Sequence, residues 1–222
     1  MDFELARFNM IEQQIRPWNV LNQRVLDLLG VIKREQFVCP SLQKLAFTDC
    51  DLPIRVQGKD TGVHMLSPKM EARLLQELEL DPQAKVLEIG TGTGYMAALL
   101  AQLCAHVTTV EANPAVAELA RQNLKTNGIT RVKVIEGCGF EQAKALGQFD
   151  AIVMSGASPV LPTVLLDALK PGGRFIGIVG EAPVMQVVQA DKNAQGQISQ
   201  KPLFETQAEV LQNAPKAVAF TF

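Results

Sequence analysis

The sequence has few of the residues that metal sites and disulfide frameworks need. Its 222 residues include four cysteines and two histidines, and no two cysteines form a Cys-x-x-Cys pair. This spacing disfavours a structural zinc site and predicts four reduced thiols in a cytoplasmic protein. We therefore expect no bound metal.

Long apolar runs and an excess of positive charge are also missing. The net charge is −2, from 21 basic and 23 acidic residues, so nothing indicates a nucleic-acid-binding surface. Gly, Pro or charged residues break every apolar stretch before it could span a bilayer, and the start MDFELARFNM does not resemble a signal peptide. We expect a cytoplasmic globular protein that binds neither nucleic acid nor membranes, with its oligomeric state left open.

The residues that are present divide one domain, 1–222, into two parts. Residues 1–80 look helical and irregular, with a helix in FELARFNMIEQQI that Pro17 ends and a second helix in LNQRVLDLLGVI. Within them, residues 39–66 have little periodicity and predict a long ordered loop, which in a compact domain is usually functional. Residues 81–222 form the second part, the expected core of the domain.

In the core, short apolar or β-branched strands alternate with helical stretches. The expected strands are KVLEIG, HVTTVEA, VKVIEG, FDAIVMSG and RFIGIVG. This alternation predicts an α/β fold with a parallel sheet covered on both faces. After Gly180, VMQVVQAD and LFETQAEVL flank the polar turn KNAQGQ, so the last strands are expected to form an antiparallel hairpin.

A glycine-rich turn follows the first strand in VLEIGTGTGY, residues 86–95. Gly90, Gly92 and Gly94 allow the backbone to approach a ligand closely, and the next helix offers free N–H groups to an anion. Glu111 ends the following strand, 19 residues after Gly92. A carboxylate at that place can bind both hydroxyls of a ribose, so the pattern predicts a nucleoside cofactor.

NAD fits part of this pattern, because Gly92-x-Gly94-x-x-Ala97 matches the dinucleotide fingerprint. Two features favour a methyltransferase cofactor instead: about 85 residues precede the first strand, and a β-hairpin ends the sheet. Glu88, just before the loop, can hold the ammonium group of a methionine moiety directly or through water. The alternative for Glu88 is a solvated charge at the strand end.

Longer segments resemble the class I S-adenosylmethionine-dependent methyltransferases, and more narrowly the protein-L-isoaspartate O-methyltransferase family. These segments are VLEIGTGTGY, VTTVEANP, FDAIVMSGASPVLPTVLLDALKPGGRFIGIVG and LFETQAEVL in the core, with RVLDLLGVIKREQFVCP and AFTDCDLPI before it. The resemblance covers nearly the whole chain. It implies a Rossmann-like, mostly parallel seven-stranded sheet with a C-terminal antiparallel hairpin, an N-terminal helical extension on the acceptor side, and S-adenosyl-L-methionine as cofactor.

Carried over by position, the resemblance also implies which residues contact the cofactor. Glu88 and the glycine loop would line its methionine end, Glu111 would bind ribose, and the turn EGCGF would lie against adenine. The full implied set is Glu88, Gly90, Thr91, Gly92, Thr93, Gly94, Glu111, Ala112, Gly137, Cys138, Gly139 and Phe140.

The chain departs from the family pattern in two important places. The family usually has an acid between the two glycines of the adenine turn, where this chain has Cys138, so that recognition of the adenine amino group is lost or replaced. The family also carries a Thr-Ile-Ser segment before the helix SPKMEARLLQELEL, with its serine at the reacting centre. Aligned from Pro68 without a gap, Leu66 takes the place of that serine and His64 that of the threonine.

Ser67 therefore has two interpretations. After a one-residue shift it would be the catalytic hydroxyl. Alternatively it is an N-cap followed by Pro68 at the first helical position, with no chemical role. In that case the apolar face of the helix comprises Met70, Leu74, Leu75 and Leu78.

The sequence leaves three possible functions open. The first is methylation of the carboxylate of isoaspartyl residues in damaged proteins. The second is methylation of a different acceptor, such as a small molecule, and the third is a cofactor-binding module without isoaspartyl activity. A carboxylate needs no general base, whereas an amine often does, and His64 is the one candidate base in the acceptor region. Because leucine cannot hydrogen-bond an acceptor carboxylate, Leu66 predicts weak or absent isoaspartyl activity.

Overall fold

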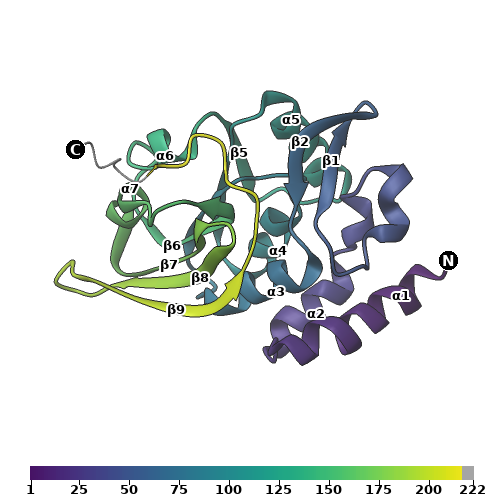
Figure 1. The fold of residues 1–222 in the computed structure, drawn as a ribbon, viewed down its shortest axis with the longest axis horizontal. Helices are drawn as coiled ribbons and strands as arrows, with labels where there is room; N and C mark the ends of the chain where they lie inside the picture. Colours follow the sequence, from purple (N-terminus) through teal and green to yellow (C-terminus); the bar gives the residue numbers. More distant parts are fainter. Residues whose placement is uncertain (217–222) are drawn as a thin grey trace.

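A seven-stranded mixed sheet organises the computed structural model, which describes residues 1–216 (Figure 1). The strand order is β5-β4-β3-β6-β7-β8-β9. The strands are β3 (Lys85–Ile89), β4 (His106–Glu111), β5 (Val132–Glu136), β6 (Phe149–Ser158), β7 (Leu169–Glu181), β8 (Val184–Lys192) and β9 (Ile198–Thr206). The first five strands in this order run parallel, while β7–β8 and β8–β9 are antiparallel. The α/β class and the C-terminal hairpin predicted from the sequence are confirmed.

Helices cover both faces of this sheet. Because neighbouring strand residues point to opposite faces, Val86 of β3 packs in one core and Leu87 and Ile89 pack in another. The first core contains α4 (Tyr95–Leu103) and α5 (Pro114–Thr126), and the second contains α6 (Gly139–Gln142) and α7 (Thr163–Asp167). This arrangement leaves the loops at the carboxyl ends of the parallel strands free to form a site.

The N-terminal part joins the first core. It comprises α1 (Phe3–Met10), α2 (Gln23–Val31), α3 (Pro68–Glu77) and a two-stranded sheet of β1 (Leu52–Val56) and β2 (Lys59–Met65), with short 3-10 helices at Arg34–Gln36 and Pro40–Leu45. Met10, Leu29 and Leu74 are at most 1% exposed and share this core with Leu99 of α4. The acceptor-side segment is therefore packed directly against the core rather than tethered to it.

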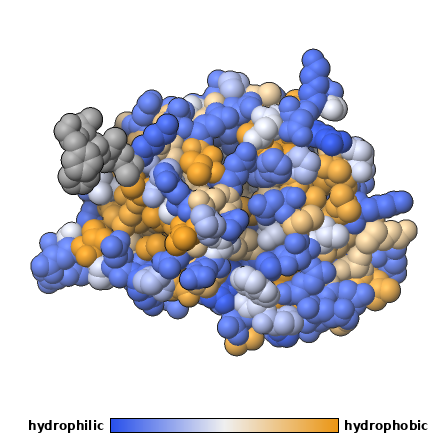
Figure 2. All heavy atoms as spheres, viewed as in Figure 1, coloured by the Kyte–Doolittle hydropathy of each residue, from blue (hydrophilic) through white to orange (hydrophobic). Residues whose placement is uncertain are grey.

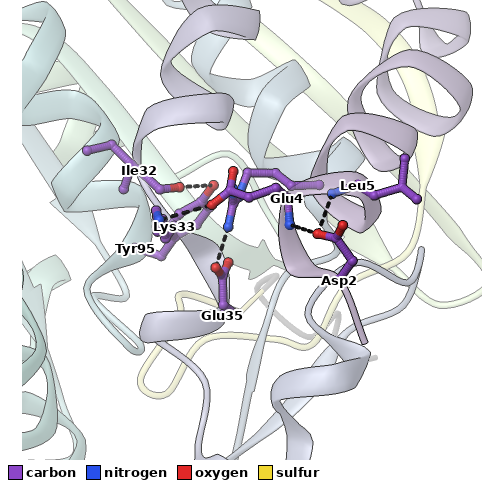
Figure 3. Close-up of polar contacts among 8 residues, drawn as sticks. Asp2, Glu4, Leu5, Ile32, Lys33, Glu35 and Tyr95 are labelled. Carbon is purple, nitrogen blue, oxygen red and sulfur yellow. Dashed lines mark hydrogen bonds and ion pairs between the residues drawn. The ribbon is translucent and has the colours of Figure 1, made fainter.

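Polar contacts fix α1 to the chain after α2. Asp2 caps α1 by accepting hydrogen bonds from Glu4 N and Leu5 N, and Lys33 Nζ lies 3.0 Å from Glu4 Oε1. Figure 3 shows Lys33 and Glu35 extending from that chain toward α1, where Glu35 pairs with the buried Arg7. These pairs orient the helices that support the acceptor side.

The predicted loop at residues 39–66 is wrong, because residues 52–65 form the β1–β2 hairpin. Pro53, Gly62 and the charged residues hide its alternation, and β2 is largely exposed. The signal that would have revealed it is Gln57-Gly58, whose φ values of 51° and 78° form the tight turn between the two strands.

Two predicted boundaries also need correction. Pro17 does not end the first helix: the helical turns continue beyond α1 through Ile11–Ile15 and Arg16–Trp18, and Asn19 ends them with φ 60°. The last strand is Ile198–Thr206 rather than LFETQAEVL, so it begins earlier and ends sooner. The residues after it leave the hairpin and run across the sheet toward α6 (Figure 1).

The surface is mixed in character. Figure 2 shows hydrophobic residues in separate patches between hydrophilic ones on the face that it presents. Across residues 1–216, no helix is long and apolar enough to span a bilayer. The same residues contain no group of three or more His, Cys, Asp or Glu side chains placed to hold a metal ion.

Candidate active site

A cleft lies at the carboxyl ends of β3, β4 and β6, where the parallel strands meet the N-terminal part. It has about 750 Å³ of empty volume, part of it open to solvent. One wall is a segment that we call the strap, residues 207–212, in which Val210 pairs with Ala157 of β6. The lining residues are Asp51, Gly62, Val63, His64, Leu66, Ile89, Gly90, Gly92, Val110, Glu111, Ala112, Gly139, Ser155, Gly156, Glu209, Val210, Leu211 and Gln212.

The glycine loop forms the floor of the cleft. Gly90 and Gly92 have φ values of 88° and 53°, which residues with a side chain rarely adopt. A Cβ at Gly90 would also lie 2.8 Å from Leu211 Cδ2 of the strap. The turn therefore favours glycine at both positions, and at Gly90 a side chain would also have to displace the tip of Leu211.

Glu111 is held at the end of β4 by backbone hydrogen bonds. Its Oε2 accepts from Gly92 N at 3.0 Å and its Oε1 accepts from Asn113 N at 3.0 Å. Burial raises the pKa of this carboxyl group. Because a carboxylate has about four acceptor positions, Glu111 can still receive two ribose hydroxyls.

Glu88 is fully buried at the end of β3. Ser155 Oγ donates to its Oε1 at 2.8 Å, whereas Oε2 has no hydrogen-bond partner among the described residues. Burial raises the pKa of Glu88 to about 8, so the carboxyl group is largely protonated at neutral pH without a cation beside it. The solvated strand-end charge that the sequence left open for Glu88 is excluded.

A smaller cavity opens beside Glu88 and continues from the cleft. Its lining brings together His64, Met65, Leu66, Glu71, Glu88, Gly90, Thr91, Gly92, Thr93, Tyr95, Met96 and Ser155. Thr91 Oγ1 lies 2.6 Å from Thr109 Oγ1, and Thr93 Oγ1 donates to Met65 Sδ at 3.6 Å. These contacts fix the loop that carries the residues implied for the methionine end.

Only one residue of the predicted adenine turn lines the cleft. Gly139 lines the cleft, but Gly137, Cys138 and Phe140 do not, and Gly94 serves as the N-cap residue of α4. Cys138 is partly buried against the second core. A Cβ at Gly137 would lie 2.1 Å from Gln142 Nε2, so Gln142 covers that side of the turn.

Leu66, not Ser67, lies in the cleft beside the glycine loop. Leu66 lines both the cleft and the smaller cavity, and Ser67 lines neither. Ser67 occupies the predicted N-cap position of α3, with Pro68 directly after it, but its side chain makes no capping hydrogen bond. Its backbone N–H instead donates to Asp51 Oδ1 at 2.7 Å.

A buried arginine fixes the backbone of Leu66. Arg34 is 1% exposed and donates to Leu66 O at 2.6 Å, Ala46 O at 2.8 Å and Glu71 Oε2 at 3.0 Å. Burial raises the pKa of Glu71 to about 7 although Arg34 opposes the shift. Arg34 thus joins α3 and the chain before β1 to the acceptor side of the cleft.

Sequence reasoning missed several lining residues. Asp51 lies in the segment that the sequence predicted as a loop. Ser155 lies in a predicted strand whose alternation gave no sign of a functional residue. Glu209 and Leu211 belong to residues that were assigned to the last strand. The signal that could have been used is a serine that directly follows the apolar run of a core strand, as Ser155 follows residues 151–154 in β6.

Comparisons with known proteins agree with this geometry. The model of the protein-L-isoaspartate(D-aspartate) O-methyltransferase family matches residues 6–209. A protein-L-isoaspartate O-methyltransferase of Methanoculleus marisnigri is 38% identical over 197 residues, covering 89% of this chain and 87% of its own, and one of Koribacter versatilis is 37% identical over 201 residues, covering 90% and 88%.

A solved structure shows the same fold. It is described as a protein-L-isoaspartate O-methyltransferase from Plasmodium falciparum in complex with S-adenosyl-L-homocysteine, and it matches with a TM-score of 0.77 at 21% identity, covering 95% of this chain and 98% of its own. This structure confirms the predicted fold class, and the family match with the two relatives confirms the predicted enzyme class. The chain belongs to the protein-L-isoaspartate O-methyltransferase family of S-adenosylmethionine-dependent enzymes.

Proposed function

We propose that the cleft binds S-adenosylmethionine with its ammonium group at Glu88, its ribose at Glu111 and its adenine near Ala112 and Gly139. The observation that carries this placement is the unpartnered, buried Oε2 of Glu88, which fits a cationic hydrogen-bond donor. The bound cofactor would supply a methyl group on a sulfonium. The chain would hold that methyl toward Leu66 and exclude water with the strap.

The acceptor is part of the proposal. Isoaspartyl residues of proteins are the substrate that the family name gives, and they are the first candidate. A different acceptor, such as a small molecule, is the second candidate, and Leu66 in the smaller cavity favours it because leucine offers no hydrogen bond to a carboxylate. A cytoplasmic location is also proposed, supported by four unpaired cysteines.

Replacing Glu111 with Ala should weaken binding of S-adenosylhomocysteine at least tenfold. The substitution removes a charged acceptor for ribose, and a hydrogen bond to a charged group contributes about 1.5–3 kcal/mol. Isothermal titration calorimetry measures the effect. Glu118→Ala, on the exposed face of α5, is the matched control. Tight NAD binding without any response to S-adenosylhomocysteine would overturn the cofactor assignment.

Binding of S-adenosylhomocysteine at pH 7 should release up to about one proton from Glu88. The ammonium group favours the ionised carboxylate, so it lowers a pKa that lies near 8 in the free protein. Titrations in buffers of different ionisation enthalpy report the released proton, and Glu88→Gln should abolish that release. Heats that do not depend on the buffer would contradict a direct contact between Glu88 and the ammonium.

The same raised pKa makes the cofactor-free protein pH-sensitive. The ordinary pKa of 4.5 applies to the unfolded chain, and the folded value lies near 8. The contribution of Glu88 to the free energy of unfolding is therefore fully present below about pH 4.5 and is lost as the pH rises toward 8. Glu71, with its pKa raised to about 7, adds a contribution of the same sign.

A further inference from the structure

A second hollow lies between β1, α5 and the chain after α2. We call it the β1 hollow, because residues 52–55 of that strand line it. It has about 970 Å³ of empty volume, part of it open to solvent, and it shares no lining residue with the cleft. β1 contacts α5 at this place, to the side of the main sheet (Figure 1). The hollow is therefore a separate space that can hold a small molecule.

Arg55 carries the only charge among the described residues that line the β1 hollow. It is partly buried, and it forms no ion pair or side-chain hydrogen bond within residues 1–216. Asp60 is its partner in the register of β1 and β2, but Asp60 Oδ1 accepts from Gly62 N instead. The guanidinium is thus left to receive an anion, and it can donate two parallel hydrogen bonds to a carboxylate.

An irregularity in β1 brings Arg55 next to an apolar wall. Neighbouring residues of a strand ordinarily point to opposite faces, but the register shifts between Pro53 and Arg55, and both Ile54 and Arg55 line the hollow. The buried side chains of Phe37 and Leu52 extend this wall. The hollow therefore combines one cation with an apolar surface, which fits a ligand that has a negative end and an apolar end.

Two residues are common to the β1 hollow and the small cavity beside Glu88. Met65 and Thr93 line both spaces, and Asn123, which also lines the hollow, donates to Thr93 O at 3.0 Å. An occupant of the hollow would therefore contact Thr93 of the glycine loop without entering the cleft. Such a ligand is distinct from both the cofactor and the methyl acceptor.

We propose that the β1 hollow is a second ligand site, for a small molecule that carries one carboxylate on an apolar ring or chain. Arg55 pairs with the carboxylate, and the apolar part lies against Phe37, Leu52 and Ile54. This site goes beyond the proposed function and does not depend on it, because the ligand occupies neither the cofactor position nor the acceptor position.

Three probes test the two halves of this ligand in calorimetric titrations. 3-Phenylpropanoate should bind at least about fivefold more tightly than the neutral 3-phenylpropanamide, because only the acid has a charge to pair with Arg55. Acetate should bind at least about tenfold more weakly than 3-phenylpropanoate, because it has no apolar body to bury. Arg55→Gln should remove the preference for the acid over the amide. Lys59→Gln, on the same hairpin but outside the hollow, should keep it. Equal affinities in the parent, or no measurable binding of the acid, would overturn the proposal.

Two cysteines report where the acid binds. Cys39 lines the β1 hollow and is partly buried, whereas Cys50 is exposed and lies outside it. 3-Phenylpropanoate should slow the alkylation of Cys39 by N-ethylmaleimide and leave that of Cys50 unchanged, as measured by mass spectrometry of the peptides. The protection should persist when S-adenosylhomocysteine is added and should be lost in Arg55→Gln. Displacement of the acid by S-adenosylhomocysteine, or equal protection in Arg55→Gln, would show that the acid binds elsewhere and would contradict the assignment.

Discussion

Replacing Arg34 with Met should lower the free energy of unfolding by about 3–5 kcal/mol. The substitution removes the donors to Leu66 O, Ala46 O and Glu71, and it leaves the carboxyl group of Glu71 buried without its counter-charge. The loss should be larger at pH 8 than at pH 5, because Glu71 can take up a proton at the lower pH. Urea unfolding at both pH values measures it.

A double variant separates the charge from the packing. Because a buried pair can often be replaced by apolar residues at little net cost, Arg34→Met with Glu71→Leu should recover much of the stability lost in the single variant. Arg73→Met, which breaks the pair between Arg73 and Glu77 on α3, is the comparison and should cost less. A loss of less than about 1 kcal/mol in Arg34→Met would show that water replaces the guanidinium.

Replacing Leu66 with Ser should raise kcat/KM for an isoaspartyl peptide about tenfold to a hundredfold above a weak parental activity. A serine hydroxyl there can donate to the acceptor carboxylate, and a hydrogen bond to a charged group contributes about 1.5–3 kcal/mol. The variant also loses a buried leucine side chain, so its rate is compared at a temperature where circular dichroism shows it folded. Labelled methyl transfer to the peptide is the measurement.

Ser67→Ala is the matched control for this experiment. Because Ser67 makes no capping hydrogen bond and does not line the cleft, the control should change stability by no more than about 0.5 kcal/mol and leave turnover unaltered. Robust parental turnover that collapses in Ser67→Ala would instead show that the serine has shifted into the reacting position.

The sequence was most informative where one local rule determines the structure. Alternating strands and helices gave the α/β core, and the glycines at 90 and 92 with Glu111 gave the cleft, because those residues share the carboxyl edge of a parallel sheet. The apolar face of α3 was also predicted correctly, with Leu74 fully buried. Each of these features is encoded within one helix, one strand or one strand–helix–strand unit of the chain.

Features made by distant residues could not be predicted in this way. The pair of His64 and Glu209 joins positions 145 residues apart, and the bonds from Arg34 to Leu66 and Glu71 join three separate segments. The β1–β2 hairpin was missed because its exposed strand lacks an apolar face. Whether the residues of the adenine turn contact the cofactor stays a prediction, and so does the role of Ser67.

The strap determines when the site can exist during synthesis. The floor of the cleft is complete once β6 has formed, but its opposite wall comes from Glu209 to Gln212. Ala157 N donates to Glu209 O, and Leu211 N donates to Ala157 O. These bonds cannot form until the ribosome has released nearly every residue that the structure describes. A chain that ends directly after β9 would therefore keep all seven strands but lack the opposite wall of the cleft, and cofactor binding would report the docked strap rather than folding of the core.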